Sequence, residues 1–375
     1  MKKKSLAALC ICFLFGLNFL WAETWSVTKR LTWNPGTSES PEMAVDSSNN
    51  IFIAYEDDTS GIPHIYLKKS TDSGLTWTNK QLTWGTNRKV DPTIGVDSSD
   101  SLHLVFKGDS NYLYLKRSTD AGNTWSSMKN VTGSYAYDPD MTLGSGSDIY
   151  VVYQGSASGN FEIFFTKSTD SGNTWSGQKR VTWNAGTSSR PLIAYESTGN
   201  IHVIWADDST GSYQVFYRKS TNDGASWSPT KRMTWTSKPA YRLAMAVDST
   251  DTIYVFFELG YYDIYLKKST DSGTSWTGTK RITWTHESSA PIVCIDANDT
   301  IHLCWKQFYS MVGRDVCYKQ STNGGTSWSG VKRLTYGIQS NTESPTIASD
   351  SNNDIHYAWE GEKPGNFEIF YKNRK

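Results

Sequence analysis

The sequence lacks an excess of charge of either sign, because its 37 lysines and arginines are matched by 37 aspartates and glutamates. This balance excludes electrostatic attraction to nucleic acid or to anionic lipid as the basis of its function. Hydrophobic residues are also sparse, at 37% of the 375 positions, where about 45–50% is usual. Aromatic residues, in contrast, reach 14%, which excludes a disordered chain and favours sheet over helix.

Long apolar runs are missing after residue 22. The one such run, Ser5–Trp21, follows the three lysines at positions 2–4, and the small residue Ala22 comes directly after it. This pattern predicts a signal peptide over residues 1–22. An uncleaved anchor helix is the alternative, although 17 residues is short for crossing a membrane. We therefore expect a secreted or periplasmic protein, cleaved near Ala22, that does not insert into the membrane afterwards.

Cysteine is scarce, with five residues, and two of these lie in the predicted signal peptide. The remaining three, Cys294, Cys304 and Cys317, fall in a single repeat on successive predicted strands. A cross-strand Cys294–Cys304 disulfide and three buried free thiols are the two alternatives. The spacing matches no zinc pattern, and no catalytic triad order or phosphate-binding loop is evident. We expect no metal and no cofactor.

What the sequence does contain is a repeat of about 50 residues, the first property to look for in such a chain. The motif Ser-Thr-Asp-x-Gly-x-Thr-Trp recurs at intervals of 48 to 52 residues, with Asn222 and Asn323 replacing the Asp in two copies. Its six copies start at Ser70, Ser118, Ser168, Ser220, Ser269 and Ser321. The motif reads as a turn, in which Asp bonds the turn backbone, Gly supplies a positive φ and Trp packs on the sheet.

Each repeat predicts four short strands. Two strand-like runs joined by an Asp/Ser/Asn/Gly turn come first, as in 41–45 and 51–55; a third precedes the Asp motif, and a Lys-Arg-x-Thr-Trp run such as Lys179–Trp183 follows it. Four alternating strands per repeat indicate the blade of a β-propeller. The regular period excludes a β-sandwich. Four histidines share the second position of the second strand with Phe52, Tyr150 and Tyr254, which indicates a packing position and not a metal cluster; they are His103, His202, His302 and His356.

The two ends of the sequence complement each other. Residues 24–33 match the second half of a repeat, Thr174–Trp183, and residues 365–372 match the first half of one. The prediction is therefore an all-β, seven-bladed propeller of four-stranded antiparallel blades, closed by pairing of the N- and C-terminal strands. One domain spans 23–375, and its seventh blade combines about 337–375 with 23–33. Without the N-terminal strand this blade would expose an unpaired edge.

The six motifs resemble the Asp-box, or bacterial neuraminidase, repeats of the sialidase-like propeller superfamily. The resemblance covers 24–375 and implies that the boxes lie on the face opposite the ligand site. Sialidases of this type have six blades, so a count of seven departs from them. A sialidase would use three arginines on the substrate carboxylate, a Tyr nucleophile with a Glu base, and an Asp acid. Arg190 and Arg242, with Arg88 or Arg314, would be the arginines, Tyr241 the nucleophile, and Asp91 or Asp138 the acid. The Arg-Ile-Pro sequence expected before the first box is absent, which argues against activity.

The loops on the opposite face from the Asp motifs, after the second and fourth strands, are expected to carry the site. Residues at equivalent positions there differ between repeats, as a binding site requires and a scaffold does not. Arginines are expected to bind carboxylate in bidentate fashion, and tyrosines to stack on a ligand. Mutual pairing of the charges on a wet surface is the alternative. The candidate ligand-binding residues are Arg190, Arg242, Glu39, Glu56, Glu258, Glu343, Glu360 and Tyr137, and the candidate catalytic residues are Asp91, Asp138 and Tyr241.

From these residues we predict a monomer that binds a glycan, including a sialylated one, or another polar ligand at the central mouth of the propeller. An exo-α-sialidase-like glycoside hydrolase is the first alternative. A protein-interaction scaffold without catalysis is the second.

Overall fold

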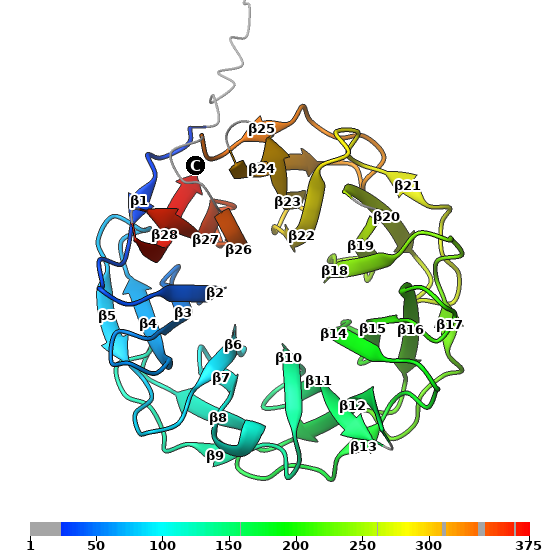
Figure 1. The fold of residues 1–375 in the computed structure, drawn as a ribbon, viewed down its shortest axis with the longest axis horizontal. Coiled ribbons are helices and arrows are strands. Elements are labelled where there is room, and N and C mark those ends of the chain that lie inside the picture. The colour runs from blue at the N-terminus through cyan, green and yellow to red at the C-terminus, as the bar shows by residue number, and fades with distance from the viewer. Residues whose placement is uncertain (1–23, 158, 261, 310–312, 337–341, 364) are drawn as a thin grey trace, which may run out of the picture.

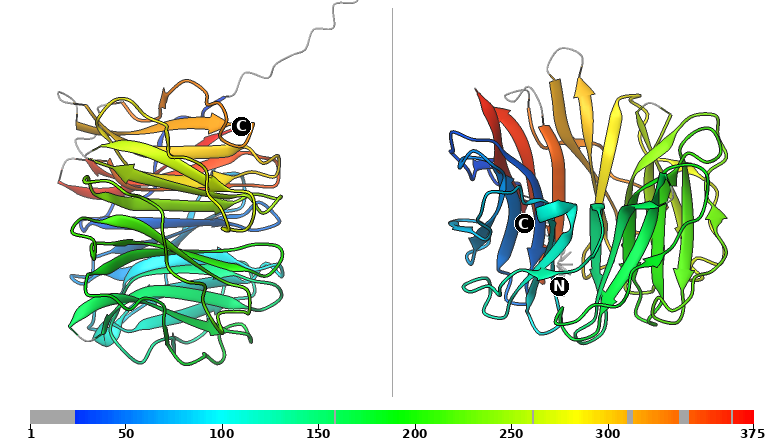
Figure 2. Two further views of the ribbon diagram at one scale, coloured as in Figure 1. Left: turned by 90° about the vertical axis from the view of Figure 1, so that its right-hand side faces the viewer. Right: turned by 60° about the horizontal axis from the view of Figure 1, so that its bottom comes forward.

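The computed structural model describes residues 24–375 apart from 158, 261, 310–312, 337–341 and 364. Seven four-stranded antiparallel sheets stand around one axis, as Figure 1 shows. The predicted all-β, seven-bladed propeller is confirmed. Figure 2 shows the blades side by side as the ring is turned. In the described residues no helix has the length and apolar character needed to cross a membrane. The predicted signal peptide, 1–22, lies outside them.

Within each blade the strands run from the axis outwards in chain order, except in blade 7. Blades 1 to 3 are β2 (Ser38–Val45), β3 (Ile51–Asp57), β4 (His64–Ser70) and β5 (Thr78–Gln81); β6 (Val90–Val96), β7 (Leu102–Lys107), β8 (Leu113–Ser118) and β9 (Lys129–Asn130); and β10 (Ala136–Leu143), β11 (Ile149–Ala157), β12 (Asn160–Ser168) and β13 (Lys179–Arg180). Blades 4 and 5 are β14 (Ser188–Tyr195), β15 (Ile201–Asp207), β16 (Gln214–Ser220) and β17 (Lys231–Arg232); and β18 (Ala240–Val247), β19 (Ile253–Leu259), β20 (Asp263–Ser269) and β21 (Lys280–Arg281). Blades 6 and 7 are β22 (Ser288–Ile295), β23 (Ile301–Tyr309), β24 (Gly313–Ser321) and β25 (Lys332–Arg333); and β26 (Thr342–Ser349), β27 (Ile355–Lys363), β28 (Asn366–Arg374) and β1 (Lys29–Arg30).

The hydrophobic core lies between neighbouring blades. Strand β3, for example, is buried along its whole length, and Phe52 and Leu67 of blade 1 share one apolar cluster with Leu102 and Leu104 of blade 2. Alternating side chains of a strand point to opposite faces of its sheet, so each blade buries both faces against its neighbours. The ring is therefore held by seven similar interfaces and closes only if the last blade is complete.

Blade 7 is completed by the N-terminus, as the sequence predicted. Lys29 and Arg30 of β1 pair with Tyr371 and Phe370 of β28, and the amide of Leu31 donates to the carbonyl of Ile369 at 2.7 Å. The side chain of Trp25 packs across to blade 6, with its ring centroid 5.2 Å from that of Tyr318. Strands β1 and β28 thus lie side by side in Figure 1, and the first strand belongs to the last blade.

Each inner strand carries a bulge that the sequence pattern did not reveal. These strands begin before the Pro where the first strand of a repeat was expected to start, and in each the pairing register shifts. The residue at the bulge has a positive φ of 41° to 53° in all seven blades, although none is glycine. A left-handed residue with a side chain costs about 1–2 kcal/mol. The bulge residues are Ser40, Asp91, Asp138, Arg190, Arg242, Ala290 and Ser344.

The Asp motif forms the expected turn. In its first copy the Asp72 carboxylate accepts a hydrogen bond from the Thr76 amide at 2.8 Å, and hydrogen bonds from Thr76 lower the pKa of Asp72 to about 2. Gly74 has φ +81°, and a Cβ there would lie 2.4 Å from the Tyr371 ring of blade 7. The Trp77 ring packs edge-on against the same Tyr371 at 4.8 Å. The motif therefore joins each blade to the preceding one.

The Lys-Arg-x-Thr-Trp motif at the outer strand also joins blades. In blade 3, Lys179 donates to the carbonyl of Gly224 in blade 4 at 3.1 Å, whereas Arg180 donates to the buried Glu162 carboxylate at 2.6 Å. The hydroxyl of Thr182 accepts the amide of Ile163 at 2.9 Å. Three of the repeated residues in this motif thus have a defined structural role.

The four histidines at the shared strand position are buried, as are two of the three cysteines. His202 bonds the Glu196 carboxylate at 2.8 Å and the Tyr217 hydroxyl at 2.8 Å, so the position that it shares with Tyr150 and Phe52 is a buried packing position. Of the two cysteine alternatives, free thiols are found: Cys294, Cys304 and Cys317 are unbonded. Burial raises the pKa of the Cys317 thiol to about 11, which makes it unreactive at neutral pH.

Candidate functional site

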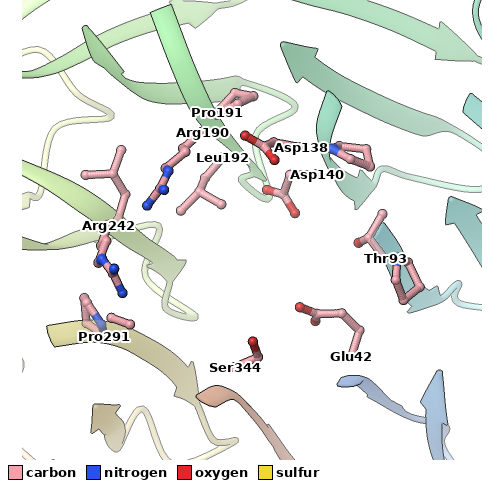
Figure 3. A pocket seen from close by; sticks show the side chains of 14 residues that line it. Glu42, Thr93, Asp138, Asp140, Arg190, Pro191, Leu192, Arg242, Pro291 and Ser344 are labelled. Carbon is pink, nitrogen blue, oxygen red and sulfur yellow. The ribbon is translucent and has the colours of Figure 1, made fainter. Parts of the chain in front are cut away.

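A cavity of about 430 Å³ lies on the propeller axis and is lined by inner strands of all seven blades. In Figure 3 the guanidinium groups of Arg190 and Arg242 point into this axial cavity from neighbouring blades. The carboxylates of Asp138, Asp140 and Glu42 point into it from the other side. Cations and anions therefore face one another across a water-filled space large enough for a small polar ligand.

The bulges place these side chains. Asp138, Arg190 and Arg242 are bulge residues with positive φ, and the axial cavity is lined by all three. Asp91, the bulge residue of blade 2, does not line it, because its carboxylate pairs with Lys107. The sequence predicted that these equivalent positions would converge, and the structure brings together Asp138, Arg190 and Arg242 but not Asp91.

Sequence reasoning missed two carboxylates of the axial cavity, Glu42 and Asp140. Each comes two residues after a bulge residue, so it points to the axis from the same strand. Burial and the neighbouring Asp140 raise the pKa of Glu42 to about 8, and burial raises that of Asp140 to about 7, against the effect of the Ile193 amide that donates to it. The same position holds Thr93 and Leu192 in other blades, so a search for acidic residues there identifies both carboxylates only once the bulge is known.

A second cavity of about 530 Å³ lies to the side, over blades 5 to 7. Arg242 lines this lateral cavity as well as the axial one, so the two spaces meet at its side chain. The remaining residues that line the lateral cavity are polar or aromatic: Tyr241, Glu258, Tyr262, His286, Glu287, Ser289, Lys306, Phe308, Arg314 and Glu343. Tyr262 and Phe308 are 47% and 44% exposed.

Tyr241 and Glu258 are paired within the lateral cavity. They are partners across strands β18 and β19, and burial, together with the charge of Glu258, raises the pKa of Tyr241. Burial also raises the pKa of Glu258, against the effect of the Arg242 guanidinium, whose Nε lies 3.6 Å from the Glu258 carboxylate. The structure therefore brings three of the predicted site residues, Tyr241, Arg242 and Glu258, into contact.

Glu343 and Arg314 lie at the other end of this cavity. The Glu343 carboxylate is shared by Lys306 and Arg314 of blade 6. Arg314 is thus the arginine that accompanies Arg242 in the lateral cavity. Arg190 lines only the axial cavity, and Arg88 lines neither cavity. Three arginines around one carboxylate, the arrangement that a sialidase needs, are spread here over two connected cavities.

The remaining predicted residues lie on blades 7, 1, 2 and 3, outside both cavities. Glu360 accepts the amide of Ser40 at 2.6 Å, and Glu56 accepts that of Asp91 at 2.8 Å. Each of these buried carboxylates thereby holds the bulge of the next blade. Glu39 is the cross-strand partner of Glu56, and burial raises its pKa. The Tyr137 ring lies under the Lys107 ammonium at 5.0 Å.

These interblade carboxylates predict a pH dependence of stability. Burial raises the pKa of Glu360 from 4.5 to about 7, so ionisation destabilises the folded protein as pH rises through that interval. At about 1.4 kcal/mol per pKa unit the effect is about 3 kcal/mol. Glu360→Gln keeps the acceptor oxygen, so it is expected to match the parent near pH 4 and to be about 2–3 kcal/mol more stable at pH 8, measured by urea unfolding. Glu287→Gln is the control, and parallel pH profiles for the parent and Glu360→Gln would contradict the prediction.

Among the described residues no group of three or more His, Cys, Asp or Glu side chains is arranged to hold a metal ion. The two cavities present guanidinium, ammonium, carboxylate, imidazole and phenol groups.

Solved structures share the fold at low sequence identity. An ulvan lyase of polysaccharide lyase family 25 superposes with a TM-score of 0.64 at 10% identity, covering 92% of this chain and 95% of that one. The NanB sialidase of Streptococcus pneumoniae superposes with a TM-score of 0.51 at 14% sequence identity, and the match covers 92% of this chain and 70% of that one. The intramolecular trans-sialidase of Ruminococcus gnavus superposes with a TM-score of 0.51 at 12% sequence identity, and the match covers 92% of this chain and 96% of that one. No protein-family model and no curated protein sequence matches the chain. The chain is a seven-bladed propeller, and its structural neighbours are sialidase and polysaccharide lyase propellers.

Proposed function

We propose that the protein binds a carboxylated glycan across the axial and lateral cavities, with Arg242 at the junction. The observation that carries this is that Arg242 lines both cavities, with Arg190 on one side and the ring of Tyr241 on the other. A guanidinium group binds a carboxylate through two parallel hydrogen bonds. The structural neighbours are named as a sialidase, a trans-sialidase and an ulvan lyase, all of which act on sugars, and this supports the proposal.

The composition of the lateral cavity fits a sugar. It combines exposed aromatic rings, Tyr262 and Phe308, with charged groups of both signs. A sugar ring has apolar faces that stack on aromatic side chains and hydroxyls that bond to carboxylates, so it uses both kinds of group. A purely apolar ligand would leave the charged groups without water or partners, at a cost of several kcal/mol.

The test is a binding titration with sialyllactose and with short uronic acid oligosaccharides. Arg242→Ala is expected to weaken binding about 10- to 100-fold, because a hydrogen bond to a charged group is worth about 1.5–3 kcal/mol. Arg88→Ala is the matched control, since Arg88 is an exposed arginine that lines neither cavity. Calorimetry measures both. Equal affinities for the parent and Arg242→Ala, or no binding of any carboxylated glycan by the parent, would exclude the proposal.

The second candidate function is hydrolysis by an exo-glycosidase of sialidase type. The contact between Tyr241 and Glu258 favours it, because a tyrosine paired with a carboxylate base can act as a nucleophile. Asp138, whose pKa burial raises, would be the acid. The titration separates the two candidates, since an enzyme releases free sialic acid from sialyllactose and a binding protein leaves it intact. An interaction scaffold would bind neither class of glycan.

The six turn motifs support placing the chain among the Asp-box propellers of the sialidase-like superfamily. We also propose export through residues 1–22 and action as a monomer outside the cytoplasm. Cell fractionation and sedimentation velocity test these two points.

A further inference from the structure

An exposed aromatic ring follows the outer strand in six of the seven blades. The side chains are 62–71% exposed, three residues after the arginine of the motif or its equivalent. They are Trp33, Trp84, Trp183, Trp235, Trp284 and Tyr336. Each ring lies in a segment that leads from an outer strand to the inner strand of the next blade, so the rings occur at six of the seven blade junctions, which we call the rim; Figure 1 shows these connecting segments as ribbons.

The fold does not account for these rings. The Lys, Arg and Thr of the same motif each make contacts that hold a blade together or join it to the next. In blade 2 the motif ends in Gly133, yet the hydroxyl of Thr132 still accepts the amide of Leu113 at 3.0 Å. The blade therefore forms without the ring. Six exposed aromatic side chains are a liability for solubility, which suggests a binding role.

Each ring has at least one cation over it, and its side chain remains 62–71% exposed. The guanidinium carbon of Arg30 lies 5.5 Å from the centroid of the Trp33 ring, and that of Arg232 lies 5.9 Å from the Trp235 ring. The arginines are fixed in turn: the Nε of Arg30 donates to the carbonyl of Thr32 at 2.7 Å, and its Nη2 to Glu368 at 2.5 Å. A ring fixed in this way loses little freedom on binding.

The second cation over several rings comes from the next blade. Arg218 of blade 4 lies over Trp183 at 5.7 Å, and Lys319 of blade 6 lies over Trp284 at 5.5 Å. These cations donate to backbone carbonyls beneath the ring, those of Val181 and Ile282. Each aromatic ring is thus a small flat apolar surface, and the polar groups around it already have hydrogen-bond partners.

We propose that these six rings are equivalent subsites that stack on separate pyranose units along a polysaccharide. A pyranose ring presents a flat apolar face with hydroxyls at its edge, which fits a single isolated ring with a polar surround. A protein partner would need a contiguous core of about 800 Å² on each side, whereas these rings are separated by charged side chains. Single-stranded nucleic acid would need cations free for phosphate, whereas Arg30, Arg180 and Arg281 are paired with carboxylates.

The six rings of the rim lie outside the axial and lateral cavities, and binding at the rings does not depend on binding in those cavities. Several weak subsites on one rigid ring bind a long chain far more tightly than each binds one sugar, because later contacts are intramolecular. We therefore expect strong binding to polymers and weak binding to short fragments of the same polymers.

The experiment is affinity electrophoresis of the full chain in gels that contain xylan, mixed-linkage β-glucan, alginate or polygalacturonate. Retardation by at least one polymer is expected. Trp183→Ala is expected to weaken the binding about 2- to 10-fold, since an aromatic contact is worth about 0.5–1.5 kcal/mol. The combined change of Trp33, Trp183, Trp235 and Trp284 to Ala is expected to abolish it. Melting temperatures should change little, because these rings are exposed.

Two controls distinguish binding at the six exposed rings of the rim from binding in the axial and lateral cavities. In gels that contain mixed-linkage β-glucan, which carries no carboxylate, Arg242→Ala is expected to keep full retardation. The combined rim variant is expected to keep the binding of short carboxylated glycans. Full retardation of the combined rim variant would overturn the inference, as would a parent that no polymer retards. A combined variant that alters only the sedimentation coefficient would show instead that the rings join copies of the protein, and that result also overturns it.

Discussion

Deletion of residues 24–33 is expected to abolish cooperative unfolding of the propeller. The deletion removes β1, exposes the edge of β28 and leaves the buried carboxylate of Glu368 without Arg30. An unpaired buried charge costs about 3–5 kcal/mol, and burial of Leu31 and Trp25 is worth about 2 kcal/mol or more for each. Together these losses approach the whole stability of about 5–15 kcal/mol that is common in proteins. Differential scanning calorimetry is the measurement.

A synthetic peptide of residues 24–33 supplies the control. Added in excess to the deletion variant, it is expected to restore a cooperative transition, because the missing strand can pair with β28 from outside. A peptide of the same composition in scrambled order should not restore it. A deletion variant that melts like the parent would show that the ring does not need its shared blade.

Glu162→Ala is expected to cost about 3–5 kcal/mol of stability, because it leaves Arg180 without its buried partner. The Glu162 carboxylate is fully buried and accepts hydrogen bonds from Arg180 at 2.6 Å and from the amide of Asn184 at 3.1 Å. Removing it leaves both donors without their acceptor. Urea unfolding, with the slope checked for two-state behaviour, measures the loss.

The chain offers its own matched control for this change. Blade 4 has Gln214 at the equivalent position, and its amide oxygen accepts the Thr234 hydroxyl at 2.9 Å and the Thr236 amide at 3.3 Å. Glu162→Gln is therefore expected to cost only about 1 kcal/mol, since the acceptor is retained. Equal losses for Glu162→Ala and Glu162→Gln would mean that the charge, and not the acceptor oxygen, is what this blade requires.

The sequence predicted the blades but only part of the site. A period of about 50 residues fixes four strands and a turn per repeat, and the matching halves at residues 24–33 and 365–372 predicted the shared blade that β1 and β28 form. Arg190, Arg242 and Asp138 were predicted to converge because they occupy equivalent positions in different repeats. Asp91 occupies the same position but pairs with Lys107, and the repeat pattern does not reveal that contact.

Two other features needed the structure. Glu42 and Asp140 are hidden in a sequence pattern because the bulge shifts the side-chain alternation of the inner strand, so their direction depends on a backbone angle and not on spacing. The sequence also does not show that Arg242 lines both the lateral and the axial cavity. The residues that line the axial cavity lie up to about 300 positions apart in the sequence.

By itself the sequence determined the blade, the number of blades and the way in which the ring closes, because these follow from local periodicity and from pairing between complementary ends. Only the tertiary structure decided which charged side chains share a cavity and which bind a neighbouring blade. The physical reason is that an ion pair needs contact within a few ångströms, and the bulges and interblade hydrogen bonds set those distances after the ring has formed.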